Sequence, residues 1–598
     1  MALLRTFLRL VPVESHRVFA LTLIVGALCG GAAVLFHLAI IAAQTRLIDR
    51  AMAVATPHWI WLTVLTPTAG GLLSGALLYF LVPGARGSGI PQVKVAYAVK
   101  GGRVPFVDAA GKFLIGVLQI GTGSSLGREG PTVQICAGVA SSIGRAAALS
   151  RENLRRLLPV GAAAGIAAAF NAPIAAVTFT IEEVIGDLDQ AVLSWLVVAA
   201  AIAAGIERSV LGEHPVFSIT THGGLSHASS LLIYAALGVA AAAVSLTFTE
   251  SLLSLRGRFR RLPIIPFWTQ PALGGLVTGL LATVALLWLH MDGVTSGGYS
   301  TLALALSGSI AIRALIVLCI FKLIATVFSY ASGGAGGIFA PALFIGGMLG
   351  GVFGHVDVAV LHHSGSEVGA FALVGMGAVF AGIVRAPITS VLIIFEMTGS
   401  YELILPLMIS NMTAYALARR IRPTGIYEAL LVQDEIHLPH RHGPVSHALE
   451  QLKVSDAMTS NVVFIPAEES PAIALERIRP HNFSTYPVVD RQQHFLGLVT
   501  EARIRRSIAE GVKEPIAQLA DQTACLSPNY PLIRAVMRMT ETNTRQMPVV
   551  EETDHTRVVG LLSMSDIVRA QAAAAKEAGA VEHTSTPPFA EERETLEA

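Results

Sequence analysis

One stretch occurs twice in the chain, as KFLIGVLQIGTGSSLGREGP at residues 112–131 and as KLIATVFSYASGGAGGIFAP at residues 322–341. Both copies open on a lysine in an apolar run, become rich in glycine and end on a proline, at a constant offset of 210. A second pair follows in the same order, NAPIAAV at 171–177 and RAPITSV at 385–391, at an offset of 214. This repeated order predicts two structurally related halves.

The composition of the 598-residue chain indicates that much of its surface faces lipid. Hydrophobic residues make up 53% and charged residues only 14%, whereas soluble domains contain about 25% charged residues. A formal net charge of +1 excludes a strongly basic nucleic-acid-binding protein. The four cysteines lie far apart without a C-x-x-C pair, which predicts neither a disulfide framework nor a zinc site. We therefore expect a polytopic membrane protein.

Hydropathy divides the chain into segments. Residues 1–16 are expected to form an amphipathic N-terminal helix rather than a cleaved signal peptide, and residues 17–430 a transmembrane domain. Apolar segments of roughly membrane-spanning length lie near 18–43, 59–83, 159–182, 191–206, 230–248, 271–290, 311–330, 368–396 and 403–418. We expect a polar linker at 431–451 and a disordered tail, rich in Ala, Glu, Thr and Pro, at 572–598.

Two glycine-rich stretches, at 121–138 and 332–350, each contain a proline and are too interrupted to be continuous spans. Broken helices at membrane depth are tolerated only where they line a protein-enclosed or water-filled cavity. In membrane proteins built from repeated halves, such helices meet near the bilayer midplane. The two stretches therefore predict the position of a transport site. Hydropathy leaves open whether the repeats are inverted or parallel.

Three motifs place a proline after glycines: GSGIP at 87–91, GREGP at 127–131 and GGAGGIFAP at 333–341. Proline suits the first turn of a helix, where its missing N–H would be unpaired in any case. The N-terminus of a helix offers unpaired N–H groups and about half a positive charge, which favours an anion. Several converging helix ends would bind an anion without a buried cation, so the anion could still leave.

The order and spacing of GSGIP, GREGP and GIFAP (337–341) resemble those of the CLC family of chloride channels and proton/chloride antiporters. The resemblance covers roughly residues 17–430. It implies a polytopic all-α membrane domain of two inverted repeats, and a homodimer with one anion pathway in each subunit.

The resemblance also implies which groups hold the anion. These are the hydroxyls of Ser88 and Tyr427 and the backbone N–H groups of Ile338 and Phe339. Serine at position 88 is typical of chloride-selective members, whereas nitrate-preferring plant members have proline there. Gln92 departs from the glutamate that many relatives carry after GSGIP, which affects a local charge pair and not the anion site.

Glu129 lies inside the GREGP motif, where a helix N-terminus would also attract an anion. When ionised, its carboxylate can occupy the anion site itself, and when protonated it has less reason to stay. Donors at the helix N-terminus favour the charged form, whereas desolvation and a neighbouring chloride disfavour it. Protonation and anion occupancy are therefore expected to be coupled, as a gate or an exchanger requires. The alternative is a buried acid paired with Arg128.

Two adjacent acids, Glu182 and Glu183, follow an apolar run at the end of a predicted span, a position that calls for an explanation. Glu182 aligns with Glu396 of the second half, which predicts a shared structural role in capping or pairing. Glu183 aligns with Met397 and predicts a specialised role. In the CLC family, antiporters typically carry glutamate at this second position and many channels an apolar residue. The resemblance thus implies that Glu183 is the internal proton-transfer acid.

A second, shorter repeat lies after residue 451, with YPVVD at 486–490 in one copy and MPVV at 547–550 in the other. Short β-branched runs alternate with helical patterns, which predicts a βαββα-like unit. The pair resembles the tandem CBS domains often attached to CLC proteins, and we place them at 452–508 and 509–571.

Tandem CBS domains often bind an adenine nucleotide between the copies, with Ser or Thr and Asp, three residues apart, holding the ribose. The second copy has Ser563 and Asp566, whereas the first has Thr500 and Arg503. The resemblance therefore implies at most one regulatory nucleotide site, and a purely structural module is an equal alternative. We expect no other cofactor and no metal.

The sequence thus predicts a proton-coupled chloride antiporter of a cell inner membrane, with chloride, protons, lipid and a second copy of the chain as partners. The basic cluster Arg419, Arg420 and Arg422 places the CBS module in the cytoplasm. A passive chloride channel, gated by voltage or pH through Glu129, is the alternative. A membrane-embedded hydrolase lacks a nucleophile or metal constellation, so we do not expect an enzyme.

Overall fold

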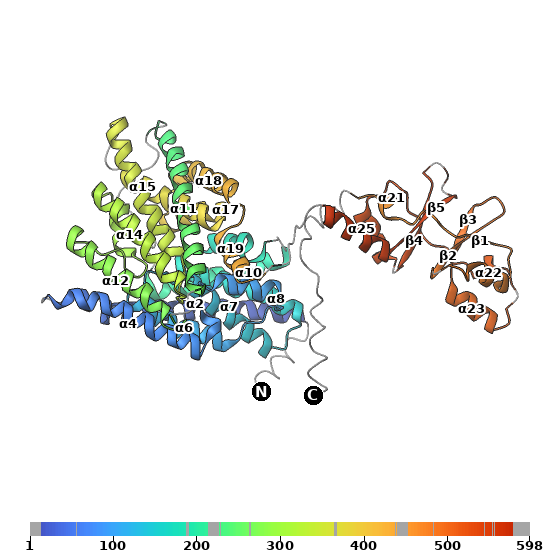
Figure 1. Ribbon diagram of the computed structural model, residues 1–598, viewed down its shortest axis with the longest axis horizontal. Coiled ribbons are helices and arrows are strands. Elements are labelled where there is room, and N and C mark those ends of the chain that lie inside the picture. Colours follow the sequence, from blue (N-terminus) through green and yellow to red (C-terminus); the bar gives the residue numbers. More distant parts are fainter. Residues whose placement is uncertain are drawn as a thin grey trace. The chain divides into compact units, whose positions relative to one another are not determined.

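The computed structural model divides the chain into two compact units, Met1–Leu438 and Pro439–Ala598, which are described separately (Figure 1). The described residues are 14–54, 57–186, 190–212, 227, 229–261, 265–363, 367–436, 438, 452–481, 483–512, 514–542, 544–552, 554 and 556–577. Most of the predicted N-terminal helix at 1–16, linker at 431–451 and tail at 572–598 lies outside these residues.

The first unit is built from helices in two halves of matching order (Figure 1). The first half contains α2 (Glu14–Arg46), α3 (Ile48–Met52), α4 (His58–Phe80), α5 (Ile90–Ala98), α6 (Phe106–Gly121), α7 (Glu129–Ala146), α8 (Arg151–Phe170), α9 (Pro173–Phe179) and α10 (Gln190–Leu211). The second contains α11 (Ser230–Arg261), α12 (Gln270–Leu289), α13 (Tyr299–Leu306), α14 (Ile312–Ala331), α15 (Phe339–Leu361), α16 (Val368–Val384), α17 (Pro387–Thr398), α18 (Ile404–Ile421) and α19 (Ile426–Gln433). The repeated stretch corresponds to α6–α7 and α14–α15.

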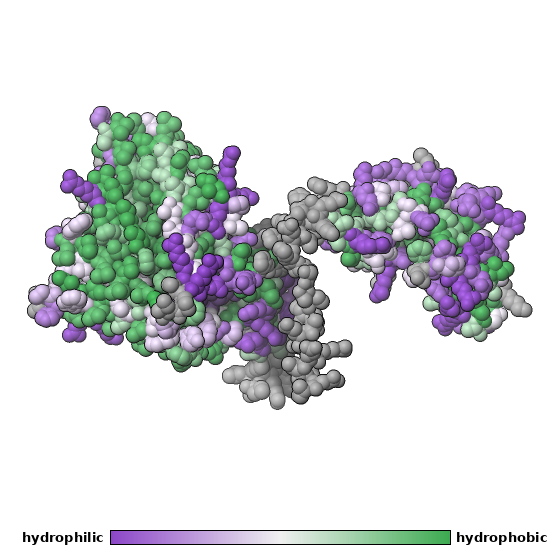
Figure 2. Space-filling model, viewed as in Figure 1, coloured by the Kyte–Doolittle hydropathy of each residue, from purple (hydrophilic) through white to green (hydrophobic). Residues whose placement is uncertain are grey.

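The surface of this unit is suited to lipid. Among the described residues, seven helical segments are long and apolar enough to cross a membrane, and they comprise α2 with α3, α4, α10, α11, α12, α14 and α15. Figure 2 shows a largely hydrophobic face over α11, α14 and α15. Large apolar side chains such as Leu232, Trp288 and Val360 are more than half exposed. In the interior, α16 is buried along its whole length. The predicted polytopic all-α membrane domain is confirmed.

Two of the predicted spans, 159–182 and 368–396, are not continuous helices. Each is interrupted at a residue with a left-handed backbone, Asn171 at φ 53° and Arg385 at φ 73°. A proline two residues later opens the next helix, because proline has no N–H to continue the preceding hydrogen-bond ladder. The short helices α9 and α17 result from these interruptions, and they occupy equivalent places in the two repeats.

The ends of α9 and α17 are capped across the repeats. Glu182, just after α9, accepts a hydrogen bond from the Thr389 N–H of α17 (2.9 Å) and another from the residue before it. Glu396, near the end of α17, accepts one from the Ala175 N–H of α9 (2.6 Å) and another from the preceding residue. A carboxylate at a helix N-terminus satisfies its unpaired N–H groups and its dipole. The predicted structural role of this pair is confirmed.

The duplicated lysines hold equivalent loops. Lys112 of α6 donates to the carbonyls of Ala85 (2.5 Å) and Gly87 (2.6 Å), in the loop that leads into α5. Lys322 of α14 donates to the carbonyl of Ser296 (2.7 Å) and to two preceding carbonyls, in the loop that leads into α13. Each lysine thus fixes the start of a short helix that points into the interior.

The second unit contains two small sheets. The first has the order β1 (Ile465–Pro466), β2 (Thr485–Val489), β3 (Phe495–Thr500), and the second pairs β4 (Gln546–Val550) with β5 (Val558–Ser563). β1 and β2 are parallel, whereas β2–β3 and β4–β5 are antiparallel. The helices are α21 (Val454–Ala457), α22 (Pro471–Ile478), α23 (Glu501–Ala509), α24 (Leu532–Glu541) and α25 (Met564–Glu577). The predicted α/β module is confirmed.

The last described helix, α25, continues past residue 572, where the sequence predicts the start of a disordered tail. Residues 572–577 are therefore helical. The sequence there is AAAAKE, and alanine, lysine and glutamate have high intrinsic helix propensity.

Loss of either cross-repeat cap is expected to destabilise the membrane unit. Glu396→Ala should fray α9 and Glu182→Ala should fray α17, each lowering the free energy of unfolding by about 0.5–2 kcal/mol, the usual effect of losing a helix cap. Thermal unfolding of the purified protein in detergent measures this loss. Glu402 is an exposed acid beyond α17, so Glu402→Ala is the control. Equal melting temperatures in all three variants would contradict the capping role.

Candidate functional site: a buried anion site between two broken helices

The three glycine motifs meet in the interior of the first unit. The Gly127 N–H donates to the Gly337 carbonyl and the Gly337 N–H to the Gly127 carbonyl, both at 2.7 Å, so the motifs of the two repeats are joined backbone to backbone. A Cβ added at Gly130 would lie 2.3 Å from the carbonyl oxygen of Ser88. Gly89 has φ +100°, a conformation that favours glycine. Glycine is therefore required for this close approach.

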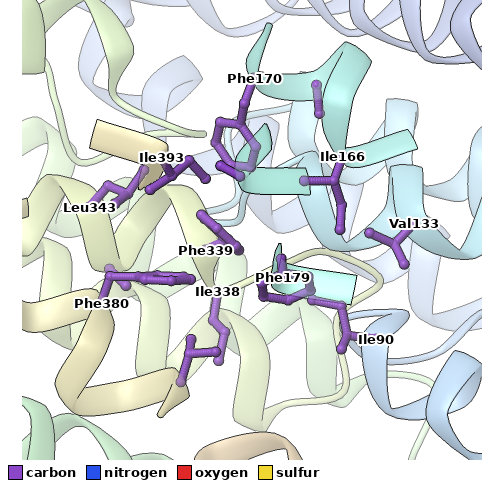
Figure 3. Close-up of a cluster of buried hydrophobic side chains, with 14 of the residues drawn as sticks. Ile90, Val133, Ile166, Phe170, Phe179, Ile338, Phe339, Leu343, Phe380 and Ile393 are labelled. Atoms are coloured by element: carbon purple, nitrogen blue, oxygen red, sulfur yellow. The ribbon is translucent and has the colours of Figure 1, made fainter. Parts of the chain in front are cut away.

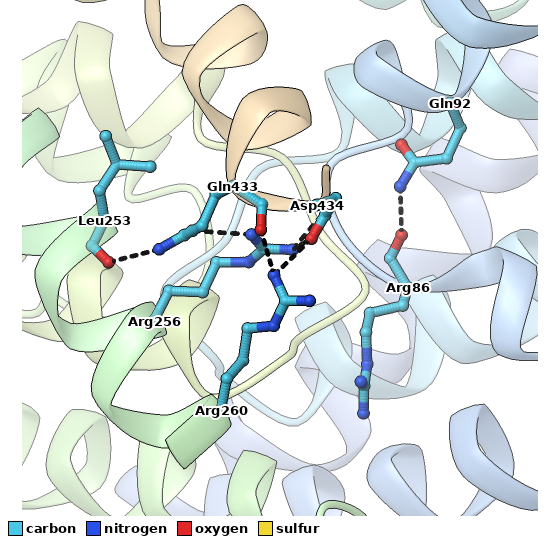
Figure 4. A network of polar contacts seen from close by, with 7 residues as sticks. All are labelled: Arg86, Gln92, Leu253, Arg256, Arg260, Gln433 and Asp434. Carbon is cyan, nitrogen blue, oxygen red and sulfur yellow. Dashed lines mark hydrogen bonds and ion pairs between the residues drawn. The ribbon is translucent and has the colours of Figure 1, made fainter. Parts of the chain in front are cut away.

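One helix starts within each of the three motifs. α5 begins at Ile90, α7 at Glu129 and α15 at Phe339. Gln92 fixes the start of α5, because its side chain accepts from the Gly89 N–H (3.0 Å) and donates to the Arg86 carbonyl (2.8 Å; Figure 4). A neutral amide thus organises this turn by hydrogen bonds instead of charge. The positive ends of these helices favour an anion.

Ser88 and Tyr427 bring buried hydroxyls to this region. Their exposed fractions are 0% and 1%, and neither hydroxyl has a hydrogen-bond partner among the described residues. A buried polar group without a partner is costly unless a ligand pairs with it. Tyr427 lies in the first turn of α19, which packs against α5. Both residues predicted to offer hydroxyls are therefore oriented as unpaired donors.

Ile338 and Phe339 lie at the start of α15, where the first N–H groups of a helix have no intrahelical acceptor. The Phe339 ring packs against Phe170, Phe179 and Phe380, with centroid distances of 4.7, 5.8 and 4.2 Å. Figure 3 shows these rings gathered around the start of α15. This apolar cluster fixes the helix end and, by lowering the local dielectric, strengthens electrostatic attraction at its N–H groups.

The Glu129 carboxylate occupies donors of the same helix end. It is 1% exposed, and its Oε2 accepts from the Ala340 N–H of α15 (3.3 Å). Its Oε1 accepts a hydrogen bond from the Tyr299 hydroxyl. The Arg128 Nε lies 3.9 Å from the same oxygen and makes no hydrogen bond within the described chain. Glu129 is therefore held mainly by donors that would suit an anion, rather than by Arg128.

Tyr299 is a site residue that the sequence did not single out. It opens α13 and lies beneath the Arg128 guanidinium, which is 5.5 Å from the ring centroid. By the repeat offset of 210, Tyr299 corresponds to Gly89, the neighbour of Ser88. The repeat alignment, applied to GSGIP, could have pointed to this hydroxyl.

Glu183 lies in a π-helical turn, Thr180–Ile185, at the end of α9. Such turns insert a residue into a helix and are frequent at functional sites. Here Glu182 reaches α17, whereas the Glu183 Oε1 lies 2.6 Å from the Lys94 Nζ of α5. The sequence did not predict a role for Lys94 either, because nothing in its spacing indicates an acidic partner 89 residues away.

Two cavities reach this region. Arg128 and Tyr299 line one of about 480 Å³. Arg86 and Arg256 line another of about 500 Å³, where Arg256 is held by Asp434 at 2.7 Å (Figure 4). The wall of the second cavity is net basic, which raises the local concentration of anions, whereas the lining of the first also includes Asp49, Glu207 and Asp292. Helix ends, unpaired hydroxyls and a buried carboxylate, flanked by two cavities, are the arrangement expected of a membrane transport protein, and they form a candidate anion site in its interior.

Comparisons with known proteins agree with this class. A family model described as voltage gated chloride channel matches residues 70–419, and the CBS domain model matches 454–510 and 516–573. The H(+)/Cl(-) exchange transporter ClcA of Salmonella arizonae is 34% identical over 427 residues, covering 69% of this chain and 87% of the relative. A protein of Ralstonia nicotianae that carries a ClcB-like chloride channel name is 34% identical over 391 residues, covering 64% and 89%.

Solved structures show the same relationship. The crystal structure of a slow cyanobacterial Cl-/H+ antiporter is similar with a TM-score of 0.64 and 29% identity, over 70% of this chain and 98% of that one. A eukaryotic CLC transporter, at 21% identity and a TM-score of 0.58 over 92% and 98%, shares the fold. The chain belongs to the voltage-gated chloride channel (CLC) family and carries a C-terminal pair of CBS domains. The predicted fold of two inverted repeats is confirmed.

In the second unit, Ser563 and Asp566 line a cavity of about 330 Å³ between the CBS copies. The Asp566 Oδ2 accepts from the Ser563 N–H (2.9 Å) and hydroxyl (2.6 Å), while the Asp566 N–H donates back to the Ser563 Oγ (3.2 Å), which caps α25. In the first copy, Thr500 caps α23 through the Arg503 N–H (3.2 Å), and Arg503 pairs with Asp521 (2.5 Å). Both motifs thus have a structural role, and only the second presents a carboxylate.

Removing the Tyr299 hydroxyl is expected to strengthen chloride binding. In Tyr299→Phe the Glu129 carboxylate loses a donor and competes less well for the start of α15. A hydrogen bond to a charged group contributes about 1.5–3 kcal/mol, so the Kd for chloride should fall by roughly 10-fold or more. Isothermal titration with chloride in detergent measures this change.

Glu129→Gln supplies the control for Tyr299→Phe, because it removes the competing charge. In that background, Tyr299→Phe should leave chloride affinity unchanged. An unchanged Kd in Tyr299→Phe alone, or the same gain in the Glu129→Gln background, would show that the hydroxyl does not act through the carboxylate.

Proposed function

We propose that the protein exchanges chloride for protons across the membrane. The observation that carries this proposal is the Glu129 carboxylate, which accepts from the Ala340 N–H and the Tyr299 hydroxyl at the start of α15. A chloride ion and an ionised carboxylate compete for such donors, whereas a protonated carboxyl group binds them poorly. Anion entry therefore favours proton uptake by Glu129, and proton release favours its return.

The anion is held by four groups in this proposal. These are the hydroxyls of Ser88 and Tyr427 and the backbone N–H groups of Ile338 and Phe339. The unpaired state of both hydroxyls and the position of both N–H groups in the first turn of α15 support this assignment. None of these four groups carries a full positive charge, which keeps binding weak enough for rapid release.

Protons take a second route, through Glu183. This acid is buried, lies in the π-helical turn that follows α9 and pairs with Lys94. Tyr427 lies on α19, which packs against α5, the helix that carries Lys94. We assign Glu183 as the internal proton-transfer acid and Lys94 as the residue that positions it. The relatives named H(+)/Cl(-) exchange transporter support the proton-coupled activity.

The proposed setting is the inner membrane of a bacterium, with the CBS module in the cytoplasm and two subunits per assembly. Arg258, Arg260 and Arg261 end α11, and Arg419 and Arg420 end α18. Cytoplasmic loops carry an excess of such residues. Arg260 pairs with Asp434 (2.8 Å), beside the connection to the CBS unit, so the basic ends and that connection share one face.

Exchange is tested in sealed proteoliposomes with a chloride gradient and no imposed pH gradient. We expect chloride to drive uphill proton movement, and Glu183→Ala to abolish proton movement while chloride flux continues. Glu428→Ala is the matched control, since Glu428 is a nearby acid of α19 without a role in the proposal. Chloride flux without uphill protons in the unaltered protein would overturn exchange and favour a gated channel of the same fold, as the ClcB-like relative's name suggests for that protein.

We also propose a single regulatory adenine-nucleotide site in the CBS module, with Ser563 and Asp566 facing the ribose. Its support is their position in the wall of the cavity between the copies. Asp566→Asn keeps an acceptor for the α25 cap but removes the charge, and should weaken ATP binding to the full chain by roughly 10-fold or more, since hydrogen bonds to charged groups contribute about 1.5–3 kcal/mol. Equilibrium dialysis with labelled ATP measures this.

Arg503→Ala is the control for the nucleotide site, because the first copy lacks the acid, and it should bind ATP as the unaltered protein does. Absence of ATP binding to the unaltered chain would leave Ser563 and Asp566 with their capping role alone and overturn the nucleotide site.

A further inference from the structure

A cluster of histidines and acids lies at the opposite end of α11 from its arginines. His227 stands just before α11, His363 follows α15, and Glu367 precedes α16. One potential ligand atom from each of these three residues lies within 4.8 Å of the others. The two imidazole rings are stacked with a centroid distance of 4.0 Å. Two chain segments, one before α11 and one between α15 and α16, therefore bring two imidazoles and a carboxylate to one point.

The cluster has unbalanced negative charge. Glu367 and Asp357 are 4% and 0% exposed. Each carboxylate lies beside a histidine, with Glu367 Oε1 3.3 Å from His227 Nδ1 and Asp357 Oδ2 2.9 Å from His363 Nδ1. Within the described residues, neither carboxylate pairs with a lysine or arginine. Buried carboxylates require a compensating charge, and the C-terminal end of α15 adds further attraction for a cation.

Asp357 prepares His363 for coordination. A metal-bound histidine usually donates its other ring N–H to a carboxylate, which fixes the tautomer and the ring orientation. Here Nδ1 faces Asp357 and the Ser230 hydroxyl (3.1 Å), so the nitrogen left for a metal is Nε2, which lies 3.4 Å from the Ser229 hydroxyl. The remaining oxygen of Asp357, Oδ1, is buried and has no partner among the described residues. This is an independent sign of a site built around a cation.

We propose that His227, His363 and Glu367 form a binding site for Zn²⁺ or a similar divalent transition metal, with Asp357 as the positioning residue for His363. Two imidazoles and one carboxylate are a usual zinc donor set that leaves a fourth position for water. Harder cations such as Mg²⁺ and Ca²⁺ prefer all-oxygen ligands. The bound metal links α11, α15 and α16. At its other end, α15 donates a hydrogen bond to the Glu129 carboxylate.

The test uses the full chain without an affinity tag, freed of metal with a chelator and titrated with ZnCl₂ in detergent by calorimetry. Co²⁺ serves as a second probe, because its visible absorption reports a tetrahedral site. We expect one Zn²⁺ per chain from this site, lost in His227→Ala and His363→Ala. Asp357→Asn should retain binding with about 10- to 100-fold weaker affinity, the usual effect of altering an outer-shell partner.

His362→Asn is the matched control. His362 adjoins the cluster but is exposed, and its left-handed backbone (φ 58°) suits asparagine. This variant should bind Zn²⁺ as the unaltered protein does, and all variants should share its melting temperature without metal. The proposal fails if the unaltered chain binds no stoichiometric Zn²⁺, if His227→Ala and His363→Ala bind as tightly as it does, or if His362→Asn weakens binding equally.

Discussion

Two backbone hydrogen bonds between Gly127 and Gly337 organise the membrane unit. They join the broken helices of the two repeats, so that α7 and α15 begin at the same place in the interior. Because glycine has no side chain, the two bridged segments approach closely. One buried group can therefore interact with the N-terminal ends of both helices. The proposed anion site depends on this contact, since a site made of partial charges needs several converging helix ends.

In the proposed exchange, the Glu129 carboxylate couples anion binding to protonation. In water, a carboxylate and a chloride ion would hardly compete, but here both need the same few donors in a region of low dielectric. The Tyr299 hydroxyl donates to this carboxylate, and aromatic rings pack around Phe339 at the start of α15. In this proposal, protonation removes the attraction, and one negative group can then replace the other.

The repeats share structure but divide function. Lys112 and Lys322 hold equivalent loops, and Glu182 and Glu396 cap each other's repeats. The repeats differ in residue type at the aligned positions 183 and 397. Glu183 faces Lys94, whereas the Met397 side chain is uncharged. An inverted duplication provides two similar scaffolds around one point, and single substitutions then give the two repeats different chemistry.

The sequence by itself determined the membrane class, the duplicated halves, the glycine motifs and the CBS pair, because hydropathy and glycine–proline spacing are local properties. It also predicted the cap at Glu182 through the alignment with Glu396. Only the tertiary structure decided that Tyr299 donates to Glu129, that Lys94 pairs with Glu183, and that 159–182 and 368–396 break in two. The first two depend on residues far apart in the chain, and the breaks depend on left-handed turns that apolar composition does not reveal.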